Sequence, residues 1–410
     1  MRNLSKAVMI AAIFVILSAV YPGLVTAEET VLVGLNVPLS GAYSPQGEDQ
    51  LKAYKLAINM LNEKGGLLGK KVVFSVKDSE TNADKARENA KALIGEGAIM
   101  LTGGSSSAEA IAQAEECQKA KVVFMAALTH SNDTTGKDAH RHTFRWYTNG
   151  HQSAKALVKV LPQKFGKAAK YAYIYADYTW GQTIQKSMQE ILEKAGASTV
   201  FNKPTKLGEK SYVSVLLEAK KTEPNVLVLV HFGNDAVNAL KQATQLKLRE
   251  KMDIVIPLME NHMAHPLGPE IMQGIVATMP WYHSLSEKYE GSKAFVAAFE
   301  KEYAKKPCNS AATAWVNIQQ YADAVTRAGS TDHVKVIKAL EGHKFKLLFN
   351  VEEYWRDWDH QAVRPNLVVV GKTPAESKGE WDLFNIIAEV PGEELVRTKE
   401  ENPVNLEPLE

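Results

Sequence analysis

The sequence predicts an α/β protein with two similar lobes, each built on a parallel-type sheet, and a ligand cleft between the lobes. Short apolar runs of strand length alternate with segments whose apolar residues recur at helical spacing. The alternation restarts near residue 171 with the same rhythm. The chain has 410 residues, which exceeds the length of a typical single domain. Since parallel strands need crossover connections, this order indicates parallel sheets with crossover helices.

The first series of elements follows the N-terminal segment directly. Its expected strands are residues 31–37, 71–76, 98–101 and 122–127. Its expected helices are residues 48–64, 83–94 and 108–119. The first helix is predicted because Leu51, Tyr54 and Ile58 fall on one of its faces.

The second series begins with an expected strand at residues 171–176. Its further strands are residues 226–230 and 254–257, and its helices are residues 181–195 and 235–246. Three later helices are expected at residues 293–303, 311–328 and 332–340. No low-complexity linker divides the chain, which predicts several short crossings between the lobes.

We place lobe 1 at residues 28–147 and 281–346, and lobe 2 at residues 148–280 and 347–410. The last range includes a C-terminal tail, whose acidic end at residues 400–410 is expected to be an exposed arm. Open α/β sheets bind ligands beyond the carboxyl ends of their strands. Two lobes can therefore hold a ligand where those ends face each other.

The N-terminus has the layout of a secretory signal peptide. Arg2 and Lys6 precede an uncharged run at residues 7–20, and Val25-Thr26-Ala27 is a small-residue cleavage site. The run is shorter than the roughly 20 residues that a membrane span needs. We expect cleavage after Ala27 and a periplasmic protein, with an uncleaved N-terminal anchor as the alternative.

Charge and cysteine content exclude several classes of protein. The formal net charge is +1, which argues against nucleic acid or an anionic membrane as the main partner. The two cysteines, Cys117 and Cys308, are too few for a disulfide-built scaffold. We expect both to be unpaired, although an oxidising compartment would permit a bond between them.

The segment Thr102-Gly103-Gly104-Ser105-Ser106-Ser107 joins an expected strand to an expected helix. The first turn of a helix has unpaired N–H groups and the positive end of the dipole, so it suits a carboxylate. Serine side chains there can turn toward an anion, and the glycines permit close approach. The alternative is an ordinary serine N-cap without a ligand.

Features of enzymes and metal sites are weak. No G-x-S-x-G segment is present, and the glycines at residues 65–71 are better explained by a turn than by a phosphate loop. Glu260, His262 and His265 lack helical spacing for a metal because Pro266 follows them. We expect no catalysis, no metal and no cofactor. Residues 355–360 are interpreted as a polar connection fixed by two tryptophans.

Six segments in this order carry a resemblance to a known family. They are residues 34–41 followed by Gly47, 58–66, 77–80 followed by Asn82, 104–107, 126–129, and Phe144-Arg145. Their order resembles that of the periplasmic solute-binding proteins of the leucine/isoleucine/valine-binding family, which serve ABC importers. The resemblance implies two Rossmann-like lobes that are joined by three hinge crossovers and close on a small molecule.

The resemblance also implies roles for individual residues. Ser106, with Ser105 beside it, matches the serine whose hydroxyl and amide hold the ligand carboxylate. Ala127 and Thr129 match paired contacts at the end of the next strand, and Glu260 matches an acid that faces the ligand's ammonium. Alternatives are that Thr129 caps a turn and that Glu260 is a solvated loop acid.

Three positions depart from the pattern of the leucine-binding proteins. Gln46, Trp180 and Phe232 stand where tyrosines line the amino-acid pocket, and Asn261 stands where the family's glycine follows the acid. Trp180 and Phe232 each follow a strand of the second lobe, so both can face the cleft; the alternative is packing in the local core. Tyr43 is a nearby candidate to restore a hydroxyl.

These observations predict an exported, non-catalytic binding protein. The expected ligand is a small carboxylate, most readily a hydrophobic or branched-chain amino acid, that the closing lobes capture and pass to a membrane-embedded ABC permease. One alternative ligand is an aromatic carboxylate without an ammonium group. Another hypothesis is a ligand-sensing module for a membrane receptor, which would share the fold. We expect a monomer and no nucleic-acid partner.

Overall fold

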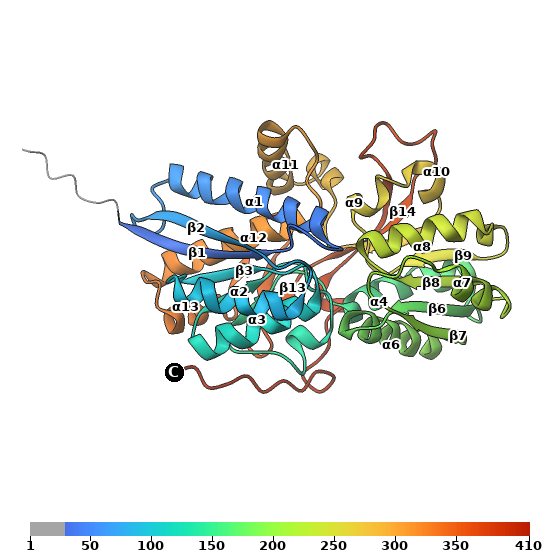
Figure 1. The fold of residues 1–410 in the computed structure, drawn as a ribbon, viewed down its shortest axis with the longest axis horizontal. Coiled ribbons are helices and arrows are strands. Elements are labelled where there is room, and N and C mark those ends of the chain that lie inside the picture. The colour runs from blue at the N-terminus through green and yellow to red at the C-terminus, as the bar shows by residue number, and fades with distance from the viewer. Residues whose placement is uncertain (1–28) are drawn as a thin grey trace, which may run out of the picture.

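The computed structural model describes residues 29–410. The expected signal peptide and its anchor alternative lie outside these residues. Within the described residues, no helix combines the length and apolar character that a membrane span requires. Two lobes lie side by side, with several chain segments passing between them (Figure 1).

Lobe 1 contains a five-stranded parallel sheet in the order β2-β1-β3-β4-β5. Its strands are β1 (Thr30–Val37), β2 (Lys71–Asp78), β3 (Met100–Gly103), β4 (Val123–Ala126) and β5 (Thr143–Arg145). Its helices are α1 (Ser44–Glu63), α2 (Ala83–Gly95), α3 (Ser107–Ala120), η1 (Asp133–Thr135), η3 (His283–Glu287), α11 (Glu290–Tyr303), α12 (Asn309–Ala328) and α13 (His333–Leu340). Helix α1 packs on α12, and α2 packs on α3. Since the chain steps from β1 out to β2 and then back past β1, right-handed crossovers put α1 and α2 on opposite faces.

Lobe 2 contains a seven-stranded mixed sheet in the order β15-β14-β10-β9-β8-β6-β7. Its strands are β6 (Lys170–Ala176), β7 (Ser198–Thr205), β8 (Val226–Val230), β9 (Asp253–Ile256), β10 (Val276–Met279), β14 (Asn366–Gly371) and β15 (Phe384–Val390). Its helices are α4 (Gly150–Val158), α5 (Leu161–Phe165), α6 (Thr179–Lys194), α7 (Val213–Lys220), α8 (Gly233–Gln245), η2 (Leu248–Glu250), α9 (Asn261–Ala264), α10 (Gly268–Met272) and η4 (Gly392–Glu394). Strand β14 runs antiparallel to both neighbours, and the other described pairings are parallel. The wholly apolar, buried β8 is typical of a strand covered on both faces.

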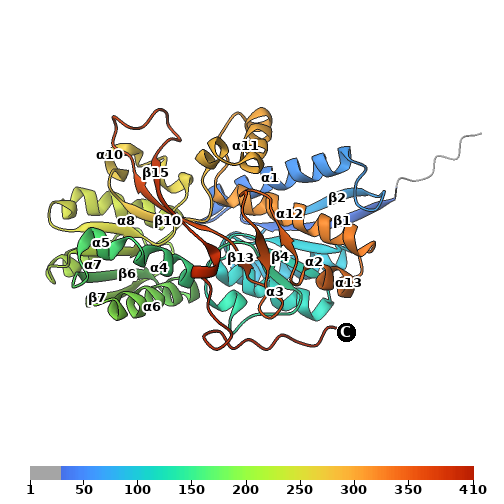
Figure 2. The same cartoon turned by 180° about the vertical axis from the view of Figure 1, so that it is seen from behind.

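The chain crosses between the lobes three times, after β5, after β10 and before β14. The third crossing comes later than the expected border at residue 347. Strands β11 (Lys344–Phe345), β12 (Glu353–Trp355) and β13 (Ala362–Val363) form a small antiparallel sheet, visible at the junction in Figure 2. This sheet stays with lobe 1 because Gln361 bridges to Arg145 of β5.

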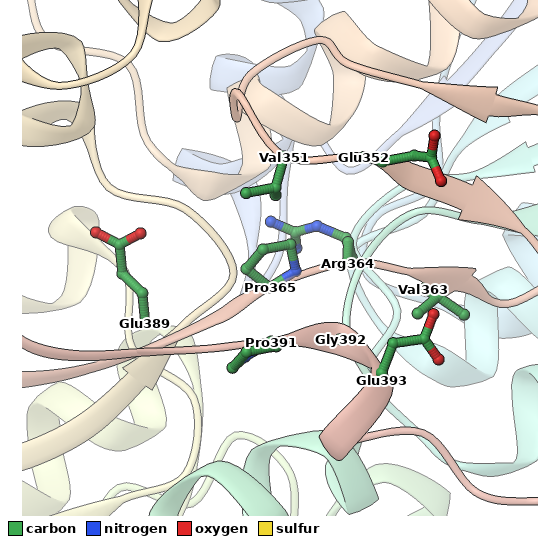
Figure 3. A pocket seen from close by; sticks show the side chains of 9 residues that line it. All are labelled: Val351, Glu352, Val363, Arg364, Pro365, Glu389, Pro391, Gly392 and Glu393. Carbon is green, nitrogen blue, oxygen red and sulfur yellow. The ribbon is translucent and has the colours of Figure 1, made fainter.

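Arg364 connects the three crossings. Its guanidinium lies 3.7 Å from the centre of the Trp146 ring, donates to the carbonyl of Pro280, and pairs with Glu353. Figure 3 shows Arg364 beside Pro365, within a hollow of about 540 Å³ behind the hinge. A buried guanidinium with these partners holds the crossing segments together at the pivot.

The C-terminal tail returns to lobe 1 and contacts it at several residues, although six of residues 400–410 are exposed as expected. Asn402 is 3% exposed and donates to the carbonyl of Thr135 at 2.8 Å. The Glu407 carboxylate accepts from the backbone of Arg141 at 2.8 Å and contacts the His140 ring at 2.6 Å. In Figure 1 the tail runs below lobe 1 to the marked C-terminus. Basic and polar groups on lobe 1 thus hold an acidic segment that composition alone would leave in solvent.

Candidate ligand-binding site

A small cavity lies between the lobes at the carboxyl ends of their strands. It has a volume of about 180 Å³, and four residues from each lobe line it. They are Ser105, Ser107, Leu128 and His130 from lobe 1, and Tyr178, Trp180, Phe232 and Leu258 from lobe 2. This position agrees with the general location of ligands in open α/β sheets, unlike the larger hollow behind the hinge.

The serine loop approaches β1 closely. Gly103 has φ of 140°, and a Cβ atom there would lie 2.0 Å from the carbonyl oxygen of Asn36. Only glycine fits at this position. The turn brings Ser105 and Ser107 to the cavity, where the Ser105 hydroxyl accepts from Gln50 at 2.7 Å. The Ser107 hydroxyl oxygen accepts from the backbone of Ser131 at 2.9 Å and so fixes the next loop.

Ser106, which the family resemblance implies holds the ligand carboxylate, is the N-cap of α3. Its side chain accepts from the Glu109 amide at 3.2 Å, and its own amide donates to the Glu109 carboxylate at 2.9 Å. These reciprocal bonds form a capping box at the start of α3. The Ser106 amide, expected to hold the ligand carboxylate, is therefore used by the protein's own carboxylate. Ser105 and Ser107 are the serines that line the cavity.

Glu109 is completely buried below this loop. Besides the Ser106 amide, it accepts a hydrogen bond from the Ser79 hydroxyl. Burial raises the pKa of this carboxyl, and the bonds from Ser79 and Ser106 oppose the rise. The Glu109 carboxyl of the capping box thus has hydrogen-bond donors for its oxygens inside lobe 1.

After β4, the residues that line the cavity are the sequence neighbours of the two expected ones. Ala127 and Thr129 are buried, and the Thr129 hydroxyl lies 2.7 Å from that of Thr134. This arrangement matches the alternative in which Thr129 stabilises a turn. The neighbouring residues Leu128 and His130 line the cavity instead.

His130 is a site residue that the sequence analysis missed. Its Nδ1 accepts from the Trp180 indole N–H at 3.1 Å across the lobes, and its Nε2 lies 2.9 Å from the Ser153 hydroxyl. Burial lowers the pKa of His130 well below its ordinary value, so the ring is neutral, with its proton on Nε2. The sequence feature that could have identified His130 is its position just after β4, next to Thr129.

Trp180 and Phe232 both line the cavity, and each is 2% exposed. Their ring centres are 6.2 Å apart, and Tyr43 of lobe 1 packs edge-on against Phe232 at 5.4 Å. The Tyr43 hydroxyl lies 3.1 Å from the Tyr178 hydroxyl of lobe 2. The cavity wall from lobe 2 is therefore aromatic, and its contacts with lobe 1 describe a closed cleft.

Glu260 is buried directly before α9, which excludes the solvated-acid alternative. Its Oε2 accepts from the Ser310 hydroxyl at 3.3 Å, whereas its Oε1 has no hydrogen-bond partner among residues 29–410. Burial and the nearby Asp49 carboxylate raise the pKa of Glu260 well above its ordinary value. The carboxyl is close enough to Tyr147 for the two groups to interact electrostatically.

Two other residues have a buried polar atom without a hydrogen-bond partner, as Glu260 does. In the part of the chain that the structure describes, the hydroxyl of Tyr147 and the Oε1 of Gln46 are buried without a hydrogen-bond partner. An unsatisfied buried polar group costs about 1–3 kcal/mol, so clustered examples indicate a position for a polar ligand group. Glu260, Tyr147 and Gln46 are not among the residues that line the small cavity, and of the three only Glu260 and Tyr147 interact with each other.

Comparison with known sequences identifies relatives of this chain. The sequence profile described as periplasmic binding protein matches residues 30–378. The Leu/Ile/Val-binding protein homolog 7 of Brucella abortus (strain 2308) is 21% identical over 336 residues. That alignment covers 79% of this chain and 84% of the relative.

Solved structures have the same fold. A periplasmic binding protein from Burkholderia mallei is 26% identical with a TM-score of 0.86, covering 92% of this chain and 99% of that one. A solute-binding protein from R. palustris, solved in complex with benzoate, is 19% identical with a TM-score of 0.77, covering 88% and 97%. The resemblance inferred from the sequence is confirmed, as is the two-lobed α/β fold. Because the family profile matches most of its length, the chain belongs to the periplasmic binding protein family.

Proposed function

We propose that this protein is the solute-binding component of an ABC importer and captures a hydrophobic or branched-chain amino acid. The observation that carries the proposal is the buried, incompletely bonded carboxyl of Glu260, which follows Leu258 of the interlobe cavity by two residues. An ammonium group would supply the missing donor and stabilise the ionised carboxylate. Names of relatives, such as Leu/Ile/Val-binding protein homolog 7, support an amino acid.

The two lobes have complementary tasks in this proposal. The hydroxyls of Ser105 and Ser107 lie in lobe 1, where they can donate to a ligand carboxylate. Trp180 and Phe232 cover the apolar side chain from lobe 2, and Glu260 meets the ammonium. A ligand that contacts both lobes binds the closed form better than the open form, and this difference drives closure.

Export and delivery belong to the same proposal. The signal peptide is cleaved after Ala27, and the mature protein acts as a monomer in the periplasm. Its closed form docks on a membrane-embedded permease. A ligand-sensing module for a membrane receptor would use the same closure, and a pull-down of the membrane partner separates it from transport.

A second candidate ligand is an aromatic carboxylate without an ammonium group. The aromatic wall of Trp180, Phe232 and Tyr178 supports it. Structural neighbours from R. palustris strains, about a fifth identical to this chain, were solved with benzoate and with p-hydroxybenzoic acid. In this case Glu260 would stay protonated and would contact no ligand charge.

A thermal-shift titration after unfolding and refolding, which removes bound ligand, separates the candidates. Matched pairs of ligands differ only in the ammonium group: leucine against 4-methylpentanoate, and phenylalanine against 3-phenylpropanoate, with benzoate added. A ligand that binds only the folded state raises the melting temperature once its concentration exceeds Kd. Stabilisation by leucine alone of the first pair supports the amino-acid proposal. Stabilisation by the acids without ammonium overturns it in favour of the second candidate, and no response to either class overturns both.

A further inference from the structure

A second group of polar side chains lies where the lobes meet, close to Glu260. Asp49 lies on α1 and Cys308 directly precedes α12, both in lobe 1, whereas His262 lies on α9 in lobe 2. A carboxylate oxygen, the sulfur and a ring nitrogen from these residues lie within 4.8 Å of one another. Asp49 and Cys308 are buried, and the partly exposed His262 gives access from solvent.

Neither Glu260, His262 and His265 nor the pair His140 and His142 has the local spacing of a metal site, so no metal is expected from the sequence. In the structure, His262 belongs to a possible metal-binding group, but Glu260 and His265 do not; Asp49 and Cys308 take their places. His265 instead stacks on Trp381 with ring centres 4.2 Å apart, and His262 meets Asp49 and Cys308 from the other lobe. A carboxylate, an imidazole and a thiolate are all common ligands of zinc.

The distances suit a tetrahedral ion. Ligand bonds of about 2.0–2.3 Å place neighbouring ligand atoms roughly 3.3–3.7 Å apart in a tetrahedral site. The Nε2 of His262 lies 3.2 Å from the Oδ2 of Asp49. At this distance the two groups attract each other directly. All three ligand atoms lie within 4.8 Å of one another, so shifts of no more than roughly 1.5 Å complete the set.

We propose that Asp49, His262 and Cys308 bind a divalent cation of the zinc class and that this ion links the two lobes across the cleft. Because the ligands come from both lobes, the complete set exists only in the closed form. The ion therefore stabilises closure by its preference for that form. The proposal does not depend on the identity of the organic ligand.

Two neighbouring groups set the conditions for binding. The Nζ of Lys305 lies 2.6 Å from the Oδ1 of Asp49, and the Cys308 amide donates to Oδ2 at 3.1 Å, so the ion binds through the other lone pair of Oδ2 and competes with an ammonium. Burial and the negative charges of Asp49 and Glu260 raise the pKa of the Cys308 thiol. Binding consequently releases the thiol proton to solvent, and no electron is transferred. Water is the natural fourth ligand.

Cobalt(II) titration of the untagged, full-length mature protein tests the site directly. A cobalt–thiolate bond gives a charge-transfer band in the near ultraviolet, and we expect this band to saturate at one equivalent and to disappear when Zn²⁺ is added. Cys117 provides a matched control because it is also a free, buried cysteine, on α3. The band should persist in Cys117→Ser and be absent in Cys308→Ser.

Two further variants keep the test decisive if Cys308→Ser does not fold. His262→Ala, at a partly exposed position, should weaken Co²⁺ binding at least tenfold, and Lys305→Met should tighten it about five- to tenfold because a competing charge is removed. With Zn²⁺ alone, small-angle scattering should report a smaller radius of gyration for the wild type but not for His262→Ala. A wild type without the thiolate band, or a band that Cys117→Ser abolishes, overturns the proposal.

Discussion

Glu109 and Glu260 are both completely buried glutamates at the beginning of a helix, one in each lobe. Glu109 accepts hydrogen bonds from the Ser79 hydroxyl and the Ser106 amide. Glu260 accepts a bond of 3.3 Å from the Ser310 hydroxyl, and the Ser310 backbone also lowers its pKa, but among residues 29–410 its second oxygen has no hydrogen-bond partner. The same side chain at similar burial is thus in two very different electrostatic environments.

The comparison separates structural from functional carboxylates. A buried charge is tolerated when hydrogen bonds replace its lost hydration, as they do for Glu109. Glu260 has the nearby Asp49 charge and too few donors, so burial without a ligand disfavours its ionised form. Glu109 accordingly stabilises the serine loop, whereas Glu260 is prepared for a cation that the ligand brings.

The largest expected effect is a loss of amino-acid affinity when Glu260 is changed. Glu260→Gln should weaken binding of an amino acid by about 2–4 kcal/mol, roughly 30- to 1000-fold, because it removes a buried charge partner of the ammonium. Isothermal titration with leucine and 4-methylpentanoate measures this loss. Affinity for 4-methylpentanoate should change little. Equal losses for the two ligands would contradict a role for Glu260 as the ammonium partner.

The second prediction concerns the free energy of unfolding when Glu109 is changed. Glu109→Ala should lower the free energy of unfolding by about 2–3 kcal/mol, because it removes the capping box and leaves the Ser79 and Ser106 groups without their acceptor. Urea unfolding measures the loss. Glu115→Ala is the matched control on the same helix, since Glu115 is 37% exposed and its ion pair with Arg87 should contribute no more than about 1 kcal/mol. Similar losses for both variants would reject the structural role of Glu109.

The pH dependence of the free energy of unfolding tests the electrostatic environment assigned to Glu260. The pKa of Glu260 in the folded protein is raised by burial, so its carboxyl binds a proton more tightly in the folded than in the unfolded state. Its contribution to stability is complete below the ordinary pKa and is lost as pH rises through the folded value. Glu260→Gln stays neutral throughout and mimics the protonated acid.

Without ligand, Glu260→Gln should therefore match the wild type near pH 4.5 and become more stable by about 1–3 kcal/mol as pH rises toward 8. Urea unfolding at several pH values gives the difference. Burial raises the pKa of Asp49, but the hydrogen bonds and charges of His262 and Lys305 outweigh burial and lower the pKa to about 2, so this neighbour titrates below the window. A wild type that gains stability over Glu260→Gln with rising pH would contradict the assigned environment.

Much of the fold and part of the site are visible in the sequence. Periodicity and strand-like runs identified the long helices and the strands β1–β4, β6, β8 and β9, because long amphipathic patterns reflect burial on one face, but they missed β5, β7 and β10–β15. Trp180 and Phe232 were predicted at the cleft since each follows a parallel strand. Ser106 was assigned to the ligand although Ser106 and Glu109 have the spacing of a capping box, a local signal that was overlooked.

Other features depend on contacts that no local pattern contains. Asp49 and Cys308 meet His262 only through packing and lobe closure. The tail was expected in solvent from its acidic composition, yet Glu407 is held by His140 and Arg141 on lobe 1. In both cases the partner lies in a distant part of the chain, and a single sequence does not report which distant groups meet.

The smallest expected effect compares the serines that serve the two glutamates. Ser106→Ala removes the acceptor of the Glu109 amide at a helix cap, which should cost about 1 kcal/mol of stability. Ser310→Ala removes a bond of 3.3 Å to a carboxyl that burial already keeps protonated, so its cost should stay below about 0.5 kcal/mol at neutral pH. Urea unfolding of both variants, and of each in the matching glutamine background, forms two double-mutant cycles. We expect measurable coupling between Ser106 and Glu109 and almost none between Ser310 and Glu260 without ligand. Binding of an amino acid should then create coupling at Glu260, because the ionised carboxylate uses every donor within reach. Equal coupling at both sites before ligand is added would mean that Glu260 is as well satisfied as Glu109, and the reason for assigning it to the ligand would disappear.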